Sequence, residues 1–162
     1  MSPTDYLVHA YTTAGKLVHM MVDDLTAEEF DRQPVPGANC AAWVVGHLTF
    51  TLRAGLIRRR VHGLPDFPAG LKDRVTATKQ AAGEQSGYGE PSALLALFDA
   101  HLEHFVRWLG GLAPEALDAA LESRAPFATT FGEAVQFGAL HIALHVGQLS
   151  TIRRALGRPP VV

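Results

Sequence analysis

The chain has 162 residues, of which 48% are hydrophobic and 19% charged, and its formal net charge is −2. A chain of this length is typical of one domain, here residues 1–162, that buries a core without disulfides or structural metals. The composition lacks the basic excess that binding to a nucleic-acid backbone requires, and no apolar stretch approaches the roughly 18 to 20 residues that span a bilayer. The first residues also lack the features of a signal peptide, so we expect a cytoplasmic protein with no nucleic-acid or membrane partner.

The first predicted helix covers residues 4–25 and starts near Pro3, a residue favoured in the first turn of a helix. Its apolar positions follow in steps of four and three, as on one buried face of a bundle helix: Leu7, Tyr11, Ala14, Val18, Met21 and Leu25. Thr26 and Glu29 then have the spacing of a capping box, which predicts a short helical turn that ends at the prolines of residues 34–37.

The second predicted helix begins near Asn39, a good N-cap residue, and runs to about Val61. The arginines of residues 58–60 mostly fall outside its expected buried stripe and indicate a solvated helix end. That stripe consists of Trp43, His47, Phe50, Ala54, Ile57 and Val61.

Residues 62–90 form a linker, with one short helix expected within residues 71–82. A helix of about 22 residues is roughly 33 Å long, so this linker can let the third helix lie parallel to the second.

The third predicted helix runs from Pro91 to the glycines at residues 110–111, with an apolar stripe at Leu94, Phe98, His101, Phe105, Trp108 or Leu109, and Leu112. A short helical turn and an irregular stretch follow within residues 113–130. Thr130 and Glu133 form a second capping box, which opens a fourth helix that ends at Gly157. The buried residues of this helix are expected to be Phe131, Val135, Gly138, Ile142, Leu149, Ile152 and Leu156. The sequence therefore predicts an all-α four-helix bundle.

Three histidines form the candidate site. His141 and His145 are four residues apart and share one helix face, and His47 belongs to an apolar stripe, where a polar group needs a partner. Three imidazoles can hold one divalent metal such as zinc, nickel, copper or iron, and they leave a coordination position open, as in catalytic sites. The alternative is a chance spacing in a chain with eight histidines, with His47 bonded only to a carbonyl group.

Four other residues are candidates for contacts around the metal or with substrate. His101 lies on the inward stripe of the third helix and could approach the same cavity, or it could be an ordinary packed residue. Gln148 shares the face of the histidine pair, so it could orient a ligand or make an interhelical hydrogen bond. Cys40 could line the cavity with a pKa lowered by the helix N-terminus, or be a small buried residue. Arg53 could bind an anionic substrate or be solvated.

Two segments carry a resemblance to a known family: PGANCAAWVVGHL, which contains His47, and HIALHVGQLSTIRRALGRPP, which contains His141, His145 and Gln148. Over nearly the whole chain the sequence resembles the DinB superfamily of DinB/YfiT-like metalloenzymes. The resemblance implies a bundle with an up-down-down-up arrangement, a metal held by the three histidines, and a homodimer. Better understood branches of the family are metal-dependent transferases or isomerases that use low-molecular-weight thiols such as bacillithiol or mycothiol.

We therefore expect a DinB-like metal-dependent enzyme with a Zn, Ni or Fe centre that transfers a thiol to a small electrophilic substrate, that is, a thiol S-transferase. One alternative is metal-assisted hydrolysis or isomerisation at the same centre. The other is a noncatalytic bundle that binds a metal or small ligand in a stress response.

Overall fold

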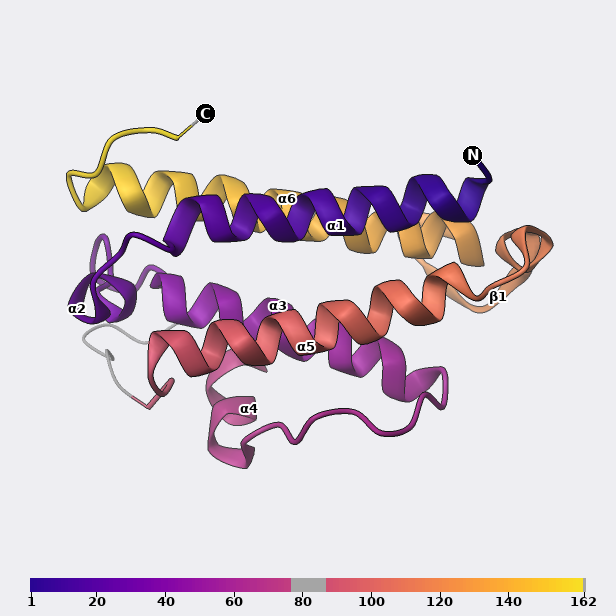
Figure 1. Cartoon of the computed structure of the whole chain (residues 1–162), viewed down its shortest axis with the longest axis horizontal. Coiled ribbons are helices and arrows are strands. Elements are labelled where there is room, and N and C mark those ends of the chain that lie inside the picture. The colour runs from indigo at the N-terminus through magenta and orange to yellow at the C-terminus, as the bar shows by residue number, and fades with distance from the viewer. Residues whose placement is uncertain (77–86, 162) are drawn as a thin grey trace.

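The computed structural model describes residues 1–76 and 87–161 and shows a bundle of four long helices (Figure 1). The long helices are α1 (Pro3–Val22), α3 (Ala41–Arg58), α5 (Pro91–Gly110) and α6 (Phe131–Ala155). The shorter elements are α2 (Ala27–Asp31), α4 (Ala69–Thr76), the 3-10 helix η1 (Pro114–Asp118), and the strands β1 (Ala120–Ala125) and β2 (Ala128–Thr130). The predicted four-helix bundle is confirmed, with a small hairpin added to it.

The long helices are not arranged as a simple up-and-down series. In Figure 1, α1 and α6 run in one direction, and α3 and α5 run in the other. The helix α1 packs against α5 and α6, and α3 packs against α5. Because α3 and α5 are parallel neighbours, the chain between them returns along the bundle, and α4 in this segment packs against the outer side of α3. The helix α4 covers the first part of the short helix predicted within residues 71–82, and residues 77–82 lie outside the described residues.

Local hydrogen bonds start α1, α2 and α6 where the sequence predicts. Both predicted capping boxes are present, at Thr26 with Glu29 before α2 and at Thr130 with Glu133 before α6. A third box, between Ser2 and Asp5, opens α1. Each box satisfies backbone N–H groups of the first turn that have no partner within the helix.

The limits of α3 differ from the prediction at both ends. The N-cap is Cys40 rather than Asn39, and its Sγ accepts the Trp43 backbone N–H at 3.4 Å. The helix ends at Arg58 rather than near Val61, because Arg60 adopts a left-handed conformation with φ of 58° and the Val61 N–H bonds back to the carbonyl of Leu56 at 3.1 Å. This left-handed turn is the common way to close a helix, although Gly is the usual residue there.

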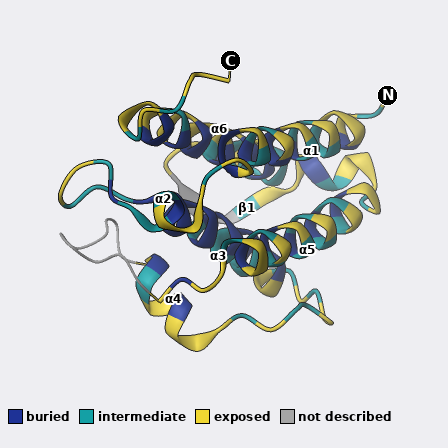
Figure 2. Cartoon of the chain, turned by 60° about the vertical axis from the view of Figure 1, so that its left-hand side comes forward, coloured by how far each residue is buried: buried dark blue, intermediate teal, exposed yellow. Residues whose placement is uncertain are grey.

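The buried face of α3 also differs from the predicted stripe. Every residue from Ala41 to Gly46 is buried, and the rest of the buried face includes Leu48, Leu52 and Leu56. Phe50 and Ala54 are only partly buried, and Ile57 is 54% exposed. A single stripe cannot describe α3 because this helix packs against α2, α4, α5 and α6 and is covered on more than one side (Figure 2).

The predicted core faces of α5 and α6 are largely confirmed. On α5, Leu109 is fully buried, while Trp108, the alternative, is only partly buried. The buried residues of α6 include Val135, Ile142, Leu149 and Ile152. The stretch predicted to be irregular before α6 contains the antiparallel pair β1 and β2 instead. The three residues of β2 are too few for an alternating apolar pattern to reveal a strand.

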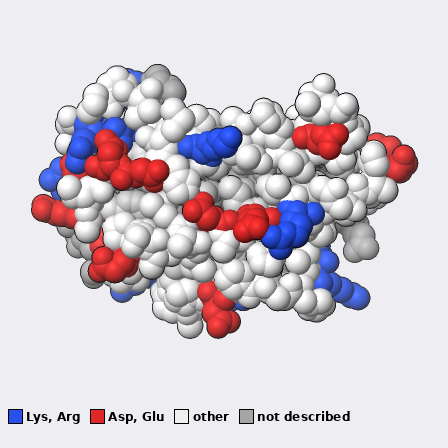
Figure 3. Space-filling view, viewed as in Figure 1, with Lys and Arg blue, Asp and Glu red and all other residues white. Residues whose placement is uncertain are grey.

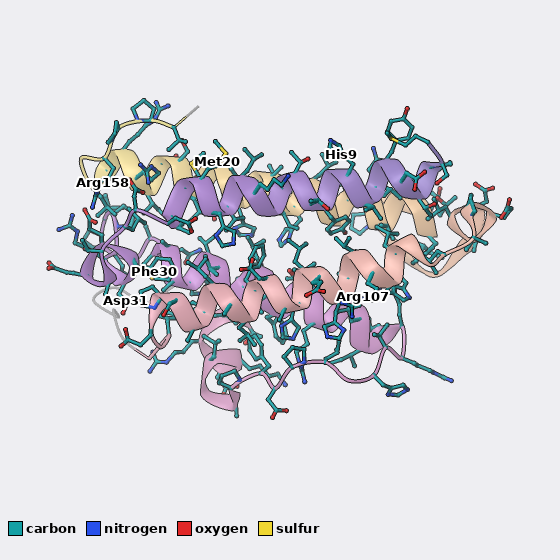
Figure 4. The ribbon with its side chains drawn as sticks, viewed as in Figure 1. His9, Met20, Phe30, Asp31, Arg107 and Arg158 are labelled. Carbon is teal, nitrogen blue, oxygen red and sulfur yellow. The ribbon has the colours of Figure 1, made fainter. Side chains whose placement is uncertain are left out.

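Ion pairs tie the end of α6 to the turn between α1 and α2. Arg153, only 3% exposed, donates to the carboxylate of Asp24 and to the backbone carbonyl of Met21. Arg158, at the α2 end of the bundle in Figure 4, donates to the Glu29 carboxylate at 2.6 Å and 3.0 Å. The hydrogen bond from Arg158 is the main reason why the pKa of the Glu29 carboxyl is lowered to about 2.

Charges of both signs lie side by side on the face shown in Figure 3, so this face carries no extended field of one sign. Among the described residues, no helix has the length and apolar character needed to cross a membrane.

His19 links α1 to α5 through two carboxylates. Its Nδ1 is 2.8 Å from Asp23 and its Nε2 is 2.8 Å from Asp99. Burial lowers the pKa of His19, but the hydrogen bonds and charges of the two carboxylates outweigh burial, and the net shift in its pKa is upward. The protonated form of His19 therefore stabilises the folded state.

Because this pKa is higher in the folded chain, the stabilisation is complete below the unfolded-state value of about 6.5 and is lost as the pH rises through the folded-state value. We expect Asp99→Asn to lower the free energy of unfolding by about 0.5–1 kcal/mol near pH 5.5 and to have little effect near pH 9. Denaturant unfolding of both proteins at the two pH values measures this difference. An equal loss at both pH values would contradict the interpretation.

Candidate metal centre

The bundle brings the three predicted histidines together. His47 comes from α3, and His141 and His145 come from successive turns of α6. One ring nitrogen of each histidine lies within 4.8 Å of the others, and the Nε2 atoms of His141 and His145 are 3.2 Å apart. Two nitrogens bound to one tetrahedral zinc ion at roughly 2.0–2.1 Å would be about 3.3 Å apart. The donor set and its spacing therefore fit a single divalent metal ion.

The ring of His47 is oriented by α4. Its Nδ1 is 2.9 Å from the backbone carbonyl of Val75, so Nδ1–H is the donor and Nε2 keeps its lone pair. Trp43 stacks on the ring, with centroids 4.7 Å apart and planes inclined by 9°, and its own Nε1–H donates to the Arg74 carbonyl at 3.1 Å. These carbonyls lie in the last described turn of α4.

Gly46 allows α4 to lie this close to α3. A Cβ atom at position 46 would be only 2.9 Å from Cγ1 of Val75 and 3.4 Å from Cδ1 of Leu71. Any side chain there would push against the helix that accepts the His47 hydrogen bond. The sequence prediction did not include Gly46, Trp43 or Val75 in the site. Their roles depend on the contact between α3 and α4, which the local pattern of neither segment reveals.

The ring of His145 is oriented by Gln148, whose Oε1 lies 2.8 Å from Nδ1. Nδ1–H therefore donates to the amide oxygen, and Nε2 points to His141. Burial lowers the pKa of His145 to about 4, assisted by repulsion from His141 and His47, and burial also lowers the pKa of His141. Both rings are thus neutral near pH 7, which is the form that binds metal.

His101 and Arg53 bond to each other rather than to the three histidines. His101 is fully buried, its Nδ1–H donates to the Leu97 carbonyl at 2.8 Å, and its Nε2 lies 3.3 Å from Nη1 of Arg53. Arg53 also donates to the carbonyl of Pro65 in the linker. The described contacts of these two residues join α3, α5 and the linker.

Cys40 is fully buried, and burial raises the pKa of its thiol to about 11. The expected lowering of this pKa by the helix N-terminus is therefore wrong, because loss of hydration outweighs the backbone N–H groups. The placement agrees with the alternative of a small buried residue.

A pocket of about 300 Å³ lies beside the metal site between α3 and α6, and His141 forms part of its wall. The rings of Tyr11 and Phe105 also line it, and both residues are buried. Arg59 lines the pocket as well, although the sequence predicts a solvated residue there. Its guanidinium lies 5.1 Å from the ring centroid of Trp108 and 4.8 Å from that of Phe131.

Comparisons with known proteins agree with this fold. The sequence matches the DinB superfamily over residues 10–149, and the chain therefore belongs to this superfamily. The structure is similar to a conserved protein from Enterococcus faecalis, with a TM-score of 0.76 and 15% sequence identity, over 98% of this chain and 99% of that one. No match was found among curated proteins.

The structure is also similar to YfiT from Bacillus subtilis, which is described as a probable metal-dependent hydrolase with an unusual four-helix bundle topology. The TM-score is 0.69 and the sequence identity 17%, with 96% of this chain and 89% of YfiT covered. At this identity the similarity shows a shared fold and does not by itself define the reaction of this chain.

We expect Gly46→Ala to weaken zinc binding by about tenfold or more, because displacement of α4 removes the hydrogen bond that orients His47. Competition with a chromophoric chelator measures the affinity. Gly70→Ala on α4 is the matched control, since a Cβ atom there meets nothing within 4 Å. Unchanged zinc affinity in a folded Gly46→Ala protein would show that α4 does not orient the ring.

Proposed function

We propose that this protein is a metal-dependent enzyme in which His47, His141 and His145 hold one divalent ion of Zn, Ni or Fe. The observation that carries the proposal is the convergence of three ring nitrogens within 4.8 Å of one another. The hydrogen bonds of His47 to Val75 and of His145 to Gln148 support it, because each leaves Nε2 available for a metal.

The metal would supply Lewis acidity and lower the pKa of a water or thiol that binds to it. The chain itself contributes three imidazoles, a number of ligands that leaves a coordination position open. The pocket beside His141 gives a small molecule access to that position and is lined mainly by apolar side chains and backbone. Cys40 has a raised pKa and is buried, so we assign it no nucleophilic role.

For the reaction, we propose transfer of a low-molecular-weight thiol to a small electrophilic substrate, as the resemblance to thiol-dependent branches of the family implies. In such a reaction the sulfur forms a bond to the electrophilic carbon, and the thiol proton and the leaving group are released. A second candidate is metal-assisted hydrolysis, favoured by the description of YfiT as a probable metal-dependent hydrolase. We place either reaction in the cytoplasm.

Elemental analysis and unfolding with and without zinc test the metal centre. We expect near-stoichiometric metal in the wild type and its loss in His145→Ala. Free zinc at about one hundred times its Kd should stabilise the wild type by about 2.7 kcal/mol and leave the variant unchanged. His9→Ala is the matched control, because His9 is exposed and points away from the bundle on α1 (Figure 4). Equal metal content in the wild type and His145→Ala would overturn the proposal.

The same preparations distinguish the candidate functions. In cobalt-substituted protein, a thiol that binds the metal should change the electronic spectrum, and conjugation of that thiol to an electrophile would support the transferase. Turnover of esters or amides without a thiol would support the hydrolase. Tight metal binding with no spectral response to thiols and no turnover would indicate a noncatalytic metal-binding bundle, for instance in a stress response.

We also propose a homodimer, as the family resemblance implies. Leu140 and Leu144, one turn apart on α6, are 54% and 66% exposed and form an apolar surface pair. We expect Leu144→Glu to shift the protein toward a monomer in light scattering, while Met20→Glu on α1 leaves the mass unchanged. A monomeric wild type would contradict this proposal.

A further inference from the structure

We propose that the pocket between α3 and α6 binds a small organic carboxylate with an apolar body, and that Arg59 is the residue that recognises the carboxylate. This inference rests on the proposed function, since it names the class of substrate or cosubstrate for the same site. It is carried by the shape of the pocket, by the charges along its wall, and by the environment of Arg59.

The wall of the pocket is apolar in its middle and positively charged at one end. Leu52, Phe105, Val135 and Ile142 provide hydrophobic surface. The charged side chains of the wall are Arg58 and Arg59, and no Asp or Glu of the described residues lines it. A volume of about 300 Å³ is at the lower end of the range for small-molecule sites. An apolar ligand with one negative charge fits this arrangement.

Arg59 is a half-buried cation without a carboxylate partner among the described residues. Nη1 donates to the Gly55 carbonyl at 2.9 Å, and Nε is buried with no hydrogen-bond partner. The rings of Trp108 and Phe131 hold the guanidinium in place. Burial and the nearby charge of Arg58 lower the pKa of Arg59, which indicates an uncompensated positive charge. A planar guanidinium of this kind is suited to bidentate binding of a carboxylate.

The pocket connects this cation to the metal site. On α6 its wall extends from Ala134 to Ile142 and includes His141, a span of about 12 Å along the helix. On α3 and its C-cap it extends from Thr51 to Arg59. Because α3 and α6 run in opposite directions (Figure 1), Arg59 lies near the start of α6, while His141 is more than two turns further along. A ligand could thus reach the metal with one end and Arg59 with the other.

The test compares phenylbutanoate with phenylbutanol, which share an apolar body and differ in charge. Binding to chelator-treated protein and to zinc-loaded protein is measured by titration in two-dimensional NMR spectra. We expect the carboxylate to bind at least about tenfold more tightly than the alcohol in both forms, because a hydrogen bond to a charged group contributes substantially in a partly buried site. The shifted signals should include the indole N–H of Trp108.

Arg59→Met keeps an unbranched stem against the two rings and removes the charge. We expect it to abolish the preference for the carboxylate, Arg59→Lys to retain part of it, and Arg154→Gln, an exposed control on α6, to retain all of it. If Arg59→Met unfolds, Arg59→Lys decides: a reduced preference for the carboxylate supports the proposal, and an unchanged preference contradicts it. Unfolding curves identify variants that do not fold.

Three results would overturn the inference. They are equal binding of phenylbutanoate and phenylbutanol to the wild type, an unchanged preference in folded Arg59→Met, and binding of inorganic phosphate as tight as that of phenylbutanoate. None of these results depends on the zinc content of the protein, because ligand binding to chelator-treated protein does not need the metal. Failure of this inference is therefore distinguishable from failure of the proposed metal centre.

Discussion

The hydrogen bond from Nδ1 of His47 to the carbonyl of Val75 is the interaction on which the candidate site depends. An imidazole that donates from one nitrogen presents a lone pair on the other, so this bond determines which atom of His47 faces α6. Trp43 supports the ring by stacking and bonds the neighbouring carbonyl of α4. The segment between α3 and α5 therefore does more than return the chain along the bundle, since its short helix orients a candidate metal ligand.

The groove between α3 and α6 combines the features that a metalloenzyme needs. At one place the three histidines present ring nitrogens within 4.8 Å of one another, and hydrogen bonds to Val75 and Gln148 orient the rings of His47 and His145. Beside them, the pocket contains apolar surface and a cation held between aromatic rings. On the opposite side of the bundle α1 packs against α5 and α6, and Tyr11 of α1 and Phe105 of α5 reach the wall of the same pocket.

Most of the fold could be predicted because α1, α5 and α6 each bury one face. In such helices, apolar residues spaced three or four apart identify the buried face, as Leu94, Phe98 and Phe105 illustrate on α5. The prediction for α3 was less accurate because this helix is covered on several sides, so Val44, Val45 and Leu48 are all buried. The hairpin before α6 is too short to leave a periodic signal.

The sequence by itself determined the four helices, the capping boxes before α2 and α6 and the set of three histidines, because each of these depends on residue types at fixed local spacing. Only the tertiary structure decided which ring nitrogen of each histidine faces the others, that Cys40 is a buried cap with a raised pKa, and that Arg59 belongs to a pocket. These properties depend on contacts between segments far apart in the chain. Burial, hydrogen-bond partners and neighbouring charges arise from packing, and no local pattern encodes them.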